Sequence, residues 1–174
     1  MYKSILNTEL CCYFDSHIDL FIHDIILKLE NACKVDHKEC LKEILNKYNF
    51  DTLNNLLLNS SVNLLVLCSK FNSNNSFDFL YTKNIDINSI DNMGMTSLLW
   101  SIKNKNYYIM NKILINEKIC IMKSNNLMET LFHIACISNN VIALKKICKL
   151  LPAETLDYQN ILGLTPLHIA CRYN

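Results

Sequence analysis

The sequence predicts an all-α fold in which short helix pairs repeat along the chain and stack against one another. Three observations predict it. A short motif recurs at steps of 33 to 36 residues, the apolar residues follow helical spacing, and a small residue recurs where each first helix should end. The length of 174 residues suits a single domain.

The repeated motif is clearest near the end of the chain, where residues 165–170 are T-P-L-H-I-A. Residues 130–135 are T-L-F-H-I-A, and residues 96–101 are T-S-L-L-W-S. Two further steps reach N-L-L-V-L-C at 63–68 and the more degenerate L-K-L-E-N-A at 27–32. A period of this length indicates units that bury their apolar faces only by stacking on their neighbours.

The second half of each unit also has helical spacing. Ile109, Met110, Ile113 and Leu114 fall on one face of a helix, and residues 143–148 repeat that spacing. The first helices are expected to end where neighbouring helices approach closely, at a small residue: Ala32, Cys68, Ser101, Ala135 and Ala170.

These motifs resemble the ankyrin-repeat family, whose signature is T-P-L-H-x-A at a period near 33. Residues 36–45 resemble the family's G-H-x-x-I-V-x-x-L-L, and residues 84–88 resemble its G-A-D-V-N. Asp91 and Gly94 stand five and two residues before Thr96, as in the family's hairpin loop, and Asn160 and Gly163 stand likewise before Thr165. The resemblance implies an ankyrin-repeat solenoid, made of stacked helix-turn-helix units with short hairpin tips.

The resemblance also gives the domain organisation. Residues 1–26 are expected to form an N-terminal capping helix region, with Asp15 or Ser16 as the N-cap and with Ile25 and Leu29 on its apolar face. Ankyrin repeats are expected over 27–174, as 27–62, 63–95, 96–129, 130–164 and a partial unit at 165–174.

Glycine is rare, although ankyrin turns usually place it where φ is positive. Those positions hold Asp36, Asn72, Asn84 and Asn139, and Asn and Asp tolerate the left-handed region best among other residues. Lys105 and Glu117 are exceptions, and residues 118–128 lack the usual Asp and Gly. We therefore expect the unit that starts at Thr96 to be the least regular.

Composition excludes several function classes. The formal net charge is +1 with a single arginine, Arg172, which argues against binding of nucleic acid. No apolar run reaches the ~18 residues of a membrane span. Nine cysteines without paired spacing indicate reduced thiols, most of them in the core, and a cytoplasmic location that can extend to the nucleus.

The sequence offers no catalytic, cofactor or metal site, so no enzyme is predicted. By family resemblance, His133 and His168 hydrogen-bond backbone between repeats. Cys33, His37 and Cys40 would suit zinc on one continuous helix, but the repeat register puts a turn at His37. The adjacent pair at residues 11–12, Cys11 and Cys12, is weak evidence for acylation.

Ankyrin stacks bind protein partners through hairpin tips and the concave face of the first helices. The tips are expected near residues 89–93, 123–127 and 158–162. Trp100 is expected to pack on the adjacent helix, with a role as a partner anchor as the alternative. The candidate partner-binding residues are Ser89, Asp91, Asn92, Met93, Trp100, Lys123, Asn126, Tyr158, Asn160 and Leu162.

Two alternatives remain beside a general protein-binding module. Residues 129–135 and 156–168 resemble the opening repeats of inhibitors of NF-κB and of their short viral copies. This resemblance implies an NF-κB/Rel-type factor as partner and a decoy that suppresses host immune signalling. The other alternative is a non-catalytic end of a larger enzyme or channel subunit.

The fifth unit is incomplete, which should leave the helix with Ala143, Leu144, Ile147 and Cys148 uncovered. We therefore expect this end to dock on a partner, to self-associate or to continue in a longer protein.

Overall fold

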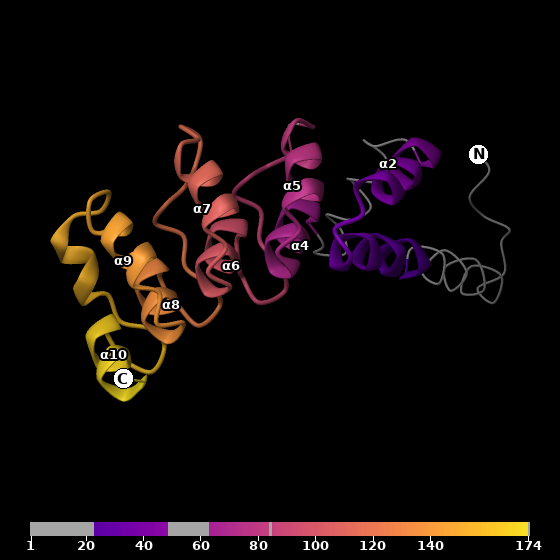
Figure 1. Ribbon diagram of the computed structural model, residues 1–174. Helices are drawn as coiled ribbons and strands as arrows, with labels where there is room; N and C mark the ends of the chain where they lie inside the picture. The colour runs from indigo at the N-terminus through magenta and orange to yellow at the C-terminus, as the bar shows by residue number, and fades with distance from the viewer. Residues whose placement is uncertain (1–22, 49–62, 84, 174) are drawn as a thin grey trace, which may run out of the picture.

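The computed structural model describes residues 23–48, 63–83 and 85–173 (Figure 1). Across these ranges the secondary structure is helical, apart from one antiparallel bridge between Ile90 and Thr96, which confirms the all-α prediction there. Residues 23–34 are helical. The elements that follow are α2 (Lys38–Lys47), α4 (Leu64–Phe71), α5 (Asn74–Tyr81), α6 (Ser97–Lys103), α7 (Tyr107–Leu114), α8 (Leu131–Ile137), α9 (Val141–Ile147), the 3₁₀ helix η1 (Ala153–Asp157) and α10 (Pro166–Tyr173).

The helices form pairs that follow one another along the molecule (Figure 1). Helix α4 packs on α5, α6 on α7, and α8 on α9. The first helices also pack in a row, in which α6 contacts both α4 and α8, and α10 contacts α8. The first helices α4, α6 and α8 each lie against the second helix of their own pair and between the first helices of the two adjacent units. Every side chain in 64–69, 97–102 and 131–136 is therefore buried.

The turn after each first helix has the same geometry in four successive units. A residue with positive φ follows the helix: Asp36 (49°), Asn72 (61°), Lys105 (56°) and Asn139 (47°). The N–H of the next residue then reaches the carbonyl five residues back, as from Asn140 to Ala135 at 2.8 Å. This is the Schellman motif, and it satisfies carbonyl groups that the helix end would leave unpaired.

The predicted left-handed positions are confirmed at Asp36, Asn72 and Asn139, while Asn84 lies outside the described residues. Lys105 was expected to depart from the pattern and does not. Its turn keeps both Schellman bonds, from Lys105 to Ile102 at 3.2 Å and from Asn106 to Ser101 at 2.8 Å. These bonds offset the cost of a side chain at positive φ, about 1 kcal/mol or more.

The small residues also lie where the motif predicts. Ala32, Cys68, Ser101 and Ala135 accept the long Schellman bond of their units and are buried. A hydrogen bond at the end of the first helix also joins successive units, because Nδ2 of Asn140 donates to the carbonyl of Ile102 in the preceding unit at 2.8 Å.

The expectation that most cysteines lie in the core is wrong for the described residues. Cys33, Cys68 and Cys136 are buried, but four thiols are exposed: Cys40, Cys120, Cys148 and Cys171. Cys148, the C-cap of α9, keeps helical backbone angles and donates its N–H to the carbonyl of Leu144, so it lies one turn beyond the half-buried Leu144 on the outer face of α9.

The C-terminal helix pair is better covered than the sequence suggested. Of the four residues expected to be uncovered, Ala143 and Ile147 are fully buried because α9 packs on α8, Leu144 is half-buried, and Cys148 is exposed as expected. The exposed apolar side chains at this end lie elsewhere: Val141, Ile142, Leu150, Leu156, Leu167 and Tyr173.

The N-terminal region is described only in part. Ile25 and Leu29 are buried, as the apolar face predicted, whereas Cys11, Cys12, Asp15 and Ser16 lie outside the described residues. No helix within the described ranges is long and apolar enough to cross a membrane.

Candidate functional site

The turn between the second and third helix pairs is built on the carboxylate of Asp91. Its Oδ1 accepts the backbone N–H groups of Met93 and Met95, both at 2.9 Å. Its Oδ2 accepts the indole N–H of Trp100 at 2.8 Å. Gly94 donates to the Asp91 carbonyl at 2.9 Å with φ of 72°, so the chain reverses within five residues. The carboxylate therefore fixes the backbone of the turn and is not free for a partner.

The same turn recurs around Asn125 and Asn160, where an amide oxygen replaces the carboxylate. Oδ1 of Asn125 accepts from Leu127 at 3.0 Å and from Glu129 at 2.9 Å. Oδ1 of Asn160 accepts from the N–H of the second and fourth residues after it, Leu162 at 3.0 Å and Leu164 at 3.1 Å. Three successive units thus present the same turn in the same register.

Asn125 and Met128 were missed by the sequence analysis, which found neither Asp nor Gly in residues 118–128. Asn125 stands five residues before Thr130, as Asp91 stands before Thr96, and this spacing could have identified it. Met128 takes the place of the turn glycine with φ of 57°. A methionine at that position gives no sequence signal, because its side chain disfavours the conformation that it adopts.

An exposed apolar residue lies at the apex of each of these turns. Met93, Leu127 and Leu162 all follow the turn-forming Asp or Asn by two residues, and their exposed fractions are 50%, 47% and 71%. We refer to these three residues as the apex row. Further exposed apolar side chains lie in the same loops: Ile90, Met122, Met128, Tyr158 and Ile161.

Backbone hydrogen bonds join one turn to the next. The N–H of Asn126 donates to the carbonyl of Met93, and the N–H of Ile161 donates to the carbonyl of Leu127, each at 3.0 Å. Each acceptor carbonyl belongs to a member of the apex row. The apolar side chains are consequently held on a bonded backbone rather than on independent loops.

The candidate partner-binding residues divide into two groups. Asn92, Met93, Asn126, Tyr158 and Leu162 are exposed in the turns. Ser89, Asp91 and Lys123 are half-buried, whereas Asn160 and Trp100 are buried. Trp100 is only 8% exposed and packs within the row of first helices, as the favoured expectation had it.

Some polar candidates have partners in the neighbouring turn. Nδ2 of Asn126 donates to the carbonyl of Asn92 at 2.9 Å. The ammonium group of Lys123 donates to the carbonyl of Asn88 at 2.7 Å. These side chains brace one turn against another.

His133 has the structural role that the family resemblance implied. It is fully buried, and its Nε2 lies 2.9 Å from the carbonyl of Leu164 in the following unit. Because a carbonyl only accepts, Nε2 carries the proton, and Nδ1 is left to accept the backbone N–H of Thr130 at 3.2 Å. Both ring nitrogens are thus occupied.

His168 differs, since its side chain is exposed. Its Nδ1 accepts the N–H of Thr165 at 3.2 Å, which is a bond within its own helical turn. The expectation that His168, like His133, hydrogen-bonds backbone between repeats is therefore wrong for the described residues.

The three residues considered as zinc ligands do not converge. Sγ of Cys33 faces Sγ of Cys68 at 3.7 Å in the core, and Nδ1 of His37 accepts the N–H of Cys40 as the cap of α2. Contact with Cys33 and burial raise the pKa of the Cys68 thiol well above its usual value, which keeps it protonated. Within the described ranges, no group of three or more His, Cys, Asp or Glu side chains is placed to hold a metal ion.

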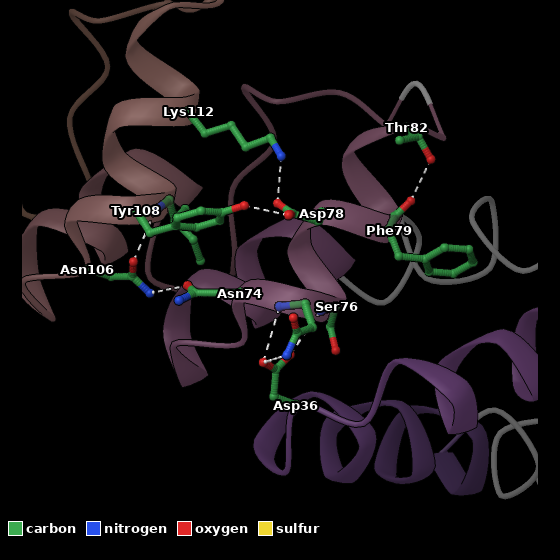
Figure 2. A network of polar contacts seen from close by, with 11 residues as sticks. Asp36, Asn74, Ser76, Asp78, Phe79, Thr82, Asn106, Tyr108 and Lys112 are labelled. Atoms are coloured by element: carbon green, nitrogen blue, oxygen red, sulfur yellow. Dashed lines mark hydrogen bonds and ion pairs between the residues drawn. The ribbon is translucent and has the colours of Figure 1, made fainter.

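The second helices are joined by a separate polar network (Figure 2). Asp78 on α5 accepts from Lys112 at 2.6 Å and from the hydroxyl of Tyr108 at 2.5 Å, both on α7. Partial burial opposes ionisation of Asp78, but these hydrogen bonds prevail and lower its pKa. Asp36 makes the equivalent connection to α5, accepting the N–H of Ser76 at 2.9 Å.

No protein-family model matches the chain, and no curated protein matches it either.

Proposed function

We propose that this chain is an ankyrin-repeat protein that binds another protein through the apex row and the adjoining face of the first helices. The motif period of 33 to 36 residues, the recurrent Schellman turns and the packing of α4, α6, α8 and α10 in a row support this fold. Such a stack joins short units into one extended surface that suits a protein partner.

The observation that carries the proposal is the repetition of an exposed apolar side chain at one register position. Single exposed apolar residues are ordinary on protein surfaces. Here Met93, Leu127 and Leu162 occupy the same place in three consecutive turns, with other apolar side chains beside them. Exposed apolar side chains gathered in neighbouring loops are typical of interaction sites.

The backbone of these turns is already fixed before a partner binds. The side-chain oxygens of Asp91, Asn125 and Asn160 and the bonds between turns fix the backbone below each apex residue. Little conformational entropy is then lost on association. Full burial of an exposed Met or Leu side chain contributes about 1.5–3 kcal/mol, and these three side chains have about half or more of their surface left to bury, so together they can contribute a few kcal/mol to binding.

A capture experiment would isolate binding proteins from a cell lysate with three tagged forms of the full chain as bait. The first form is the wild type. The tip variant carries Met93→Lys, Leu127→Lys and Leu162→Lys, and the control variant carries Ile115→Lys, Val141→Lys and Ile142→Lys. All six substituted residues are exposed apolar side chains, and the two variants gain the same charge. Circular dichroism would first show that all three forms fold.

The proposal predicts proteins that bind wild type and the control variant saturably and fail to bind the tip variant. Binding that the tip variant retains in full would contradict it, as would the absence of any saturable partner of the wild-type chain.

A further inference from the structure

Three exposed lysines lie near the C-terminal ends of three successive first helices: Lys34 at the end of the helical residues 23–34, Lys70 on α4 and Lys103 on α6. Aromatic rings lie between them. The ammonium groups of Lys34 and Lys70 lie 5.3 and 5.6 Å from the centroid of Phe71. Those of Lys70 and Lys103 lie 5.6 and 4.8 Å from the centroid of Trp100. We refer to these five residues as the lysine-aromatic row.

The lysines of this row are held in place without being neutralised. Cation-π contacts with the two rings restrict where the ammonium groups lie. The ion pairs seen in the described ranges join other lysines, namely Lys28, Lys42 and Lys112. Lysine is favoured at a helix C-terminus by the helix dipole, but this partial charge offsets only about half of one unit charge. A positive surface therefore spans three units.

An open hollow of about 110 Å³ lies beside this row, between α4 and the first apex turn. It borders Lys70 of the lysine-aromatic row and Met93 of the apex row, with Val66 and Leu67 as apolar walls. The hollow thus connects the two surfaces.

One residue that lines the hollow has a buried hydrogen-bond donor without an acceptor among the described residues. Asn63 lines the hollow and is 3% exposed, and its Oδ1 caps α4 by accepting from Leu65 and Val66. Within the part of the chain that the structure describes, its Nδ2 has no hydrogen-bond partner. A buried amide N–H without an acceptor costs about 1–3 kcal/mol, which an incoming carbonyl or carboxylate oxygen would recover.

Two carboxylates also line the hollow, Glu30 and Asp91. Asp91 accepts three hydrogen bonds, two from backbone N–H groups and one from the indole N–H of Trp100, which disperse part of its charge. Glu30 is half-buried and opposes an anion at this place. Since Asp91 also holds the turn together, Glu30 is the lining carboxylate whose removal should improve binding of an acidic group without disturbing the fold.

We infer that the protein partner presents an acidic segment, whose carboxylates lie along Lys34, Lys70 and Lys103 and whose acceptor oxygen enters the hollow at Nδ2 of Asn63. The inference rests on the proposed function and names the chemistry of the partner. Apolar side chains of the same segment would lie against the apex row, which the hollow adjoins at Met93.

Nucleic acid fits this surface less well than an acidic peptide does. Single strands bind by stacking bases on exposed aromatic faces, whereas Trp100 is buried and lysines already lie over its ring and that of Phe71. The formal net charge of the chain is only +1, and it contains one arginine.

The test pans a random peptide library displayed on phage against the full chain. The variant that we call the row variant carries Lys34→Glu, Lys70→Glu and Lys103→Glu. The control variant carries Lys118→Glu, Lys145→Glu and Lys149→Glu, which are exposed lysines elsewhere and give the same change in charge. The emission of Trp100, the only tryptophan, then measures the affinity of the selected peptides for each form and for Glu30→Gln.

The wild type and the control variant are expected to enrich peptides with excess Asp and Glu beside apolar residues, and the row variant is expected to lose that excess. Reversal of Lys70 alone should weaken the affinity of a selected peptide up to about fivefold, since one exposed ion pair contributes up to about that factor. Glu30→Gln should tighten it. Asn63→Asp keeps the oxygen that caps α4 but removes the Nδ2 donor, and it should weaken binding.

Enrichment without acidic bias, or an acidic bias that the row variant keeps, would overturn the inference while leaving the proposed function intact. Tighter binding of an oligothymidylate than of the selected peptides would also overturn it. No enrichment by any form would count against the proposed function itself.

Discussion

Met128 and Gly163 occupy the same position of successive turns, with φ of 57° and 71°. A glycine takes this conformation without steric cost, whereas a methionine does so under strain of about 1–2 kcal/mol. The turn at Asn125 tolerates that strain because its side-chain and backbone hydrogen bonds match those of the turns that contain glycine.

Replacement of Met128 by glycine should therefore stabilise the protein. Relief of the strain outweighs the added flexibility of the unfolded chain, so we expect a gain of about 0.5–1 kcal/mol in the free energy of unfolding. Urea denaturation followed by circular dichroism would measure it. Met128→Ala serves as the control, since alanine keeps a Cβ and should change little. A destabilised Met128→Gly protein would show that the side chain contributes packing that outweighs the strain.

The two turn glycines should differ in their tolerance of alanine. At Gly163 nothing lies within 4 Å of the added Cβ, so the cost is the backbone strain alone, about 1–2 kcal/mol. At Gly94 the Cβ would lie 2.6 Å from the backbone nitrogen of Asn126. The turns must then move apart, which should cost at least about 1 kcal/mol more. Equal losses of stability in the two variants would contradict the close approach of these turns.

The two histidines should also differ. His133→Ala should lower the free energy of unfolding by about 2–3 kcal/mol, because the N–H of Thr130 and the carbonyl of Leu164 lose their buried partner. His168→Ala should cost less than about 1 kcal/mol, since its side chain is exposed and bonds within its own turn. Thermal unfolding of both variants would compare them, and a larger loss for His168→Ala would refute the assignment.

Thiol reactivity should separate the cysteines by burial. Cys40, Cys120, Cys148 and Cys171 should react quickly with a thiol reagent near pH 8 in the native protein. Cys33, Cys68 and Cys136 should react only on unfolding, because burial hides them. For Cys68, contact with Cys33 and burial also raise the pKa, and burial raises that of Cys136, so their reactive thiolates form only at higher pH. Peptide mapping of the labelled sites would test this, and early labelling of Cys68 would contradict it.

The sequence was sufficient to predict the features that depend on spacing. The small residues, the Asp and Asn at the left-handed turns and the loop tips all lie in register, because the motif fixes how each unit packs on the next. Burial at particular positions was harder to predict. Cys148 has the spacing of a core residue and helical backbone angles, yet it lies with Leu144 on the outer face of α9 and is exposed.

The turn at Asn125 shows a second limit. The backbone conformation of this turn is set by two hydrogen bonds that the amide oxygen of Asn125 accepts. They hold Met128 at a positive φ, which the conformational preference of methionine does not predict. The lysine-aromatic row was missed for another reason. Lys34, Lys70 and Lys103 are unremarkable in sequence, and only the stacking of units brings them beside Phe71 and Trp100.

The most direct test of protein binding through the apex row is site-specific photo-cross-linking. A photoreactive phenylalanine analogue would replace Leu127 in one form of the chain and Ile115 in another, a residue that is 81% exposed and lies outside the apex row. Each form would be irradiated with the partner that the capture experiment identifies. The account predicts a partner adduct from position 127 that excess unlabelled wild-type chain competes away, and no such adduct from position 115. Equal adducts from both positions, or an adduct from position 115 alone, would contradict it.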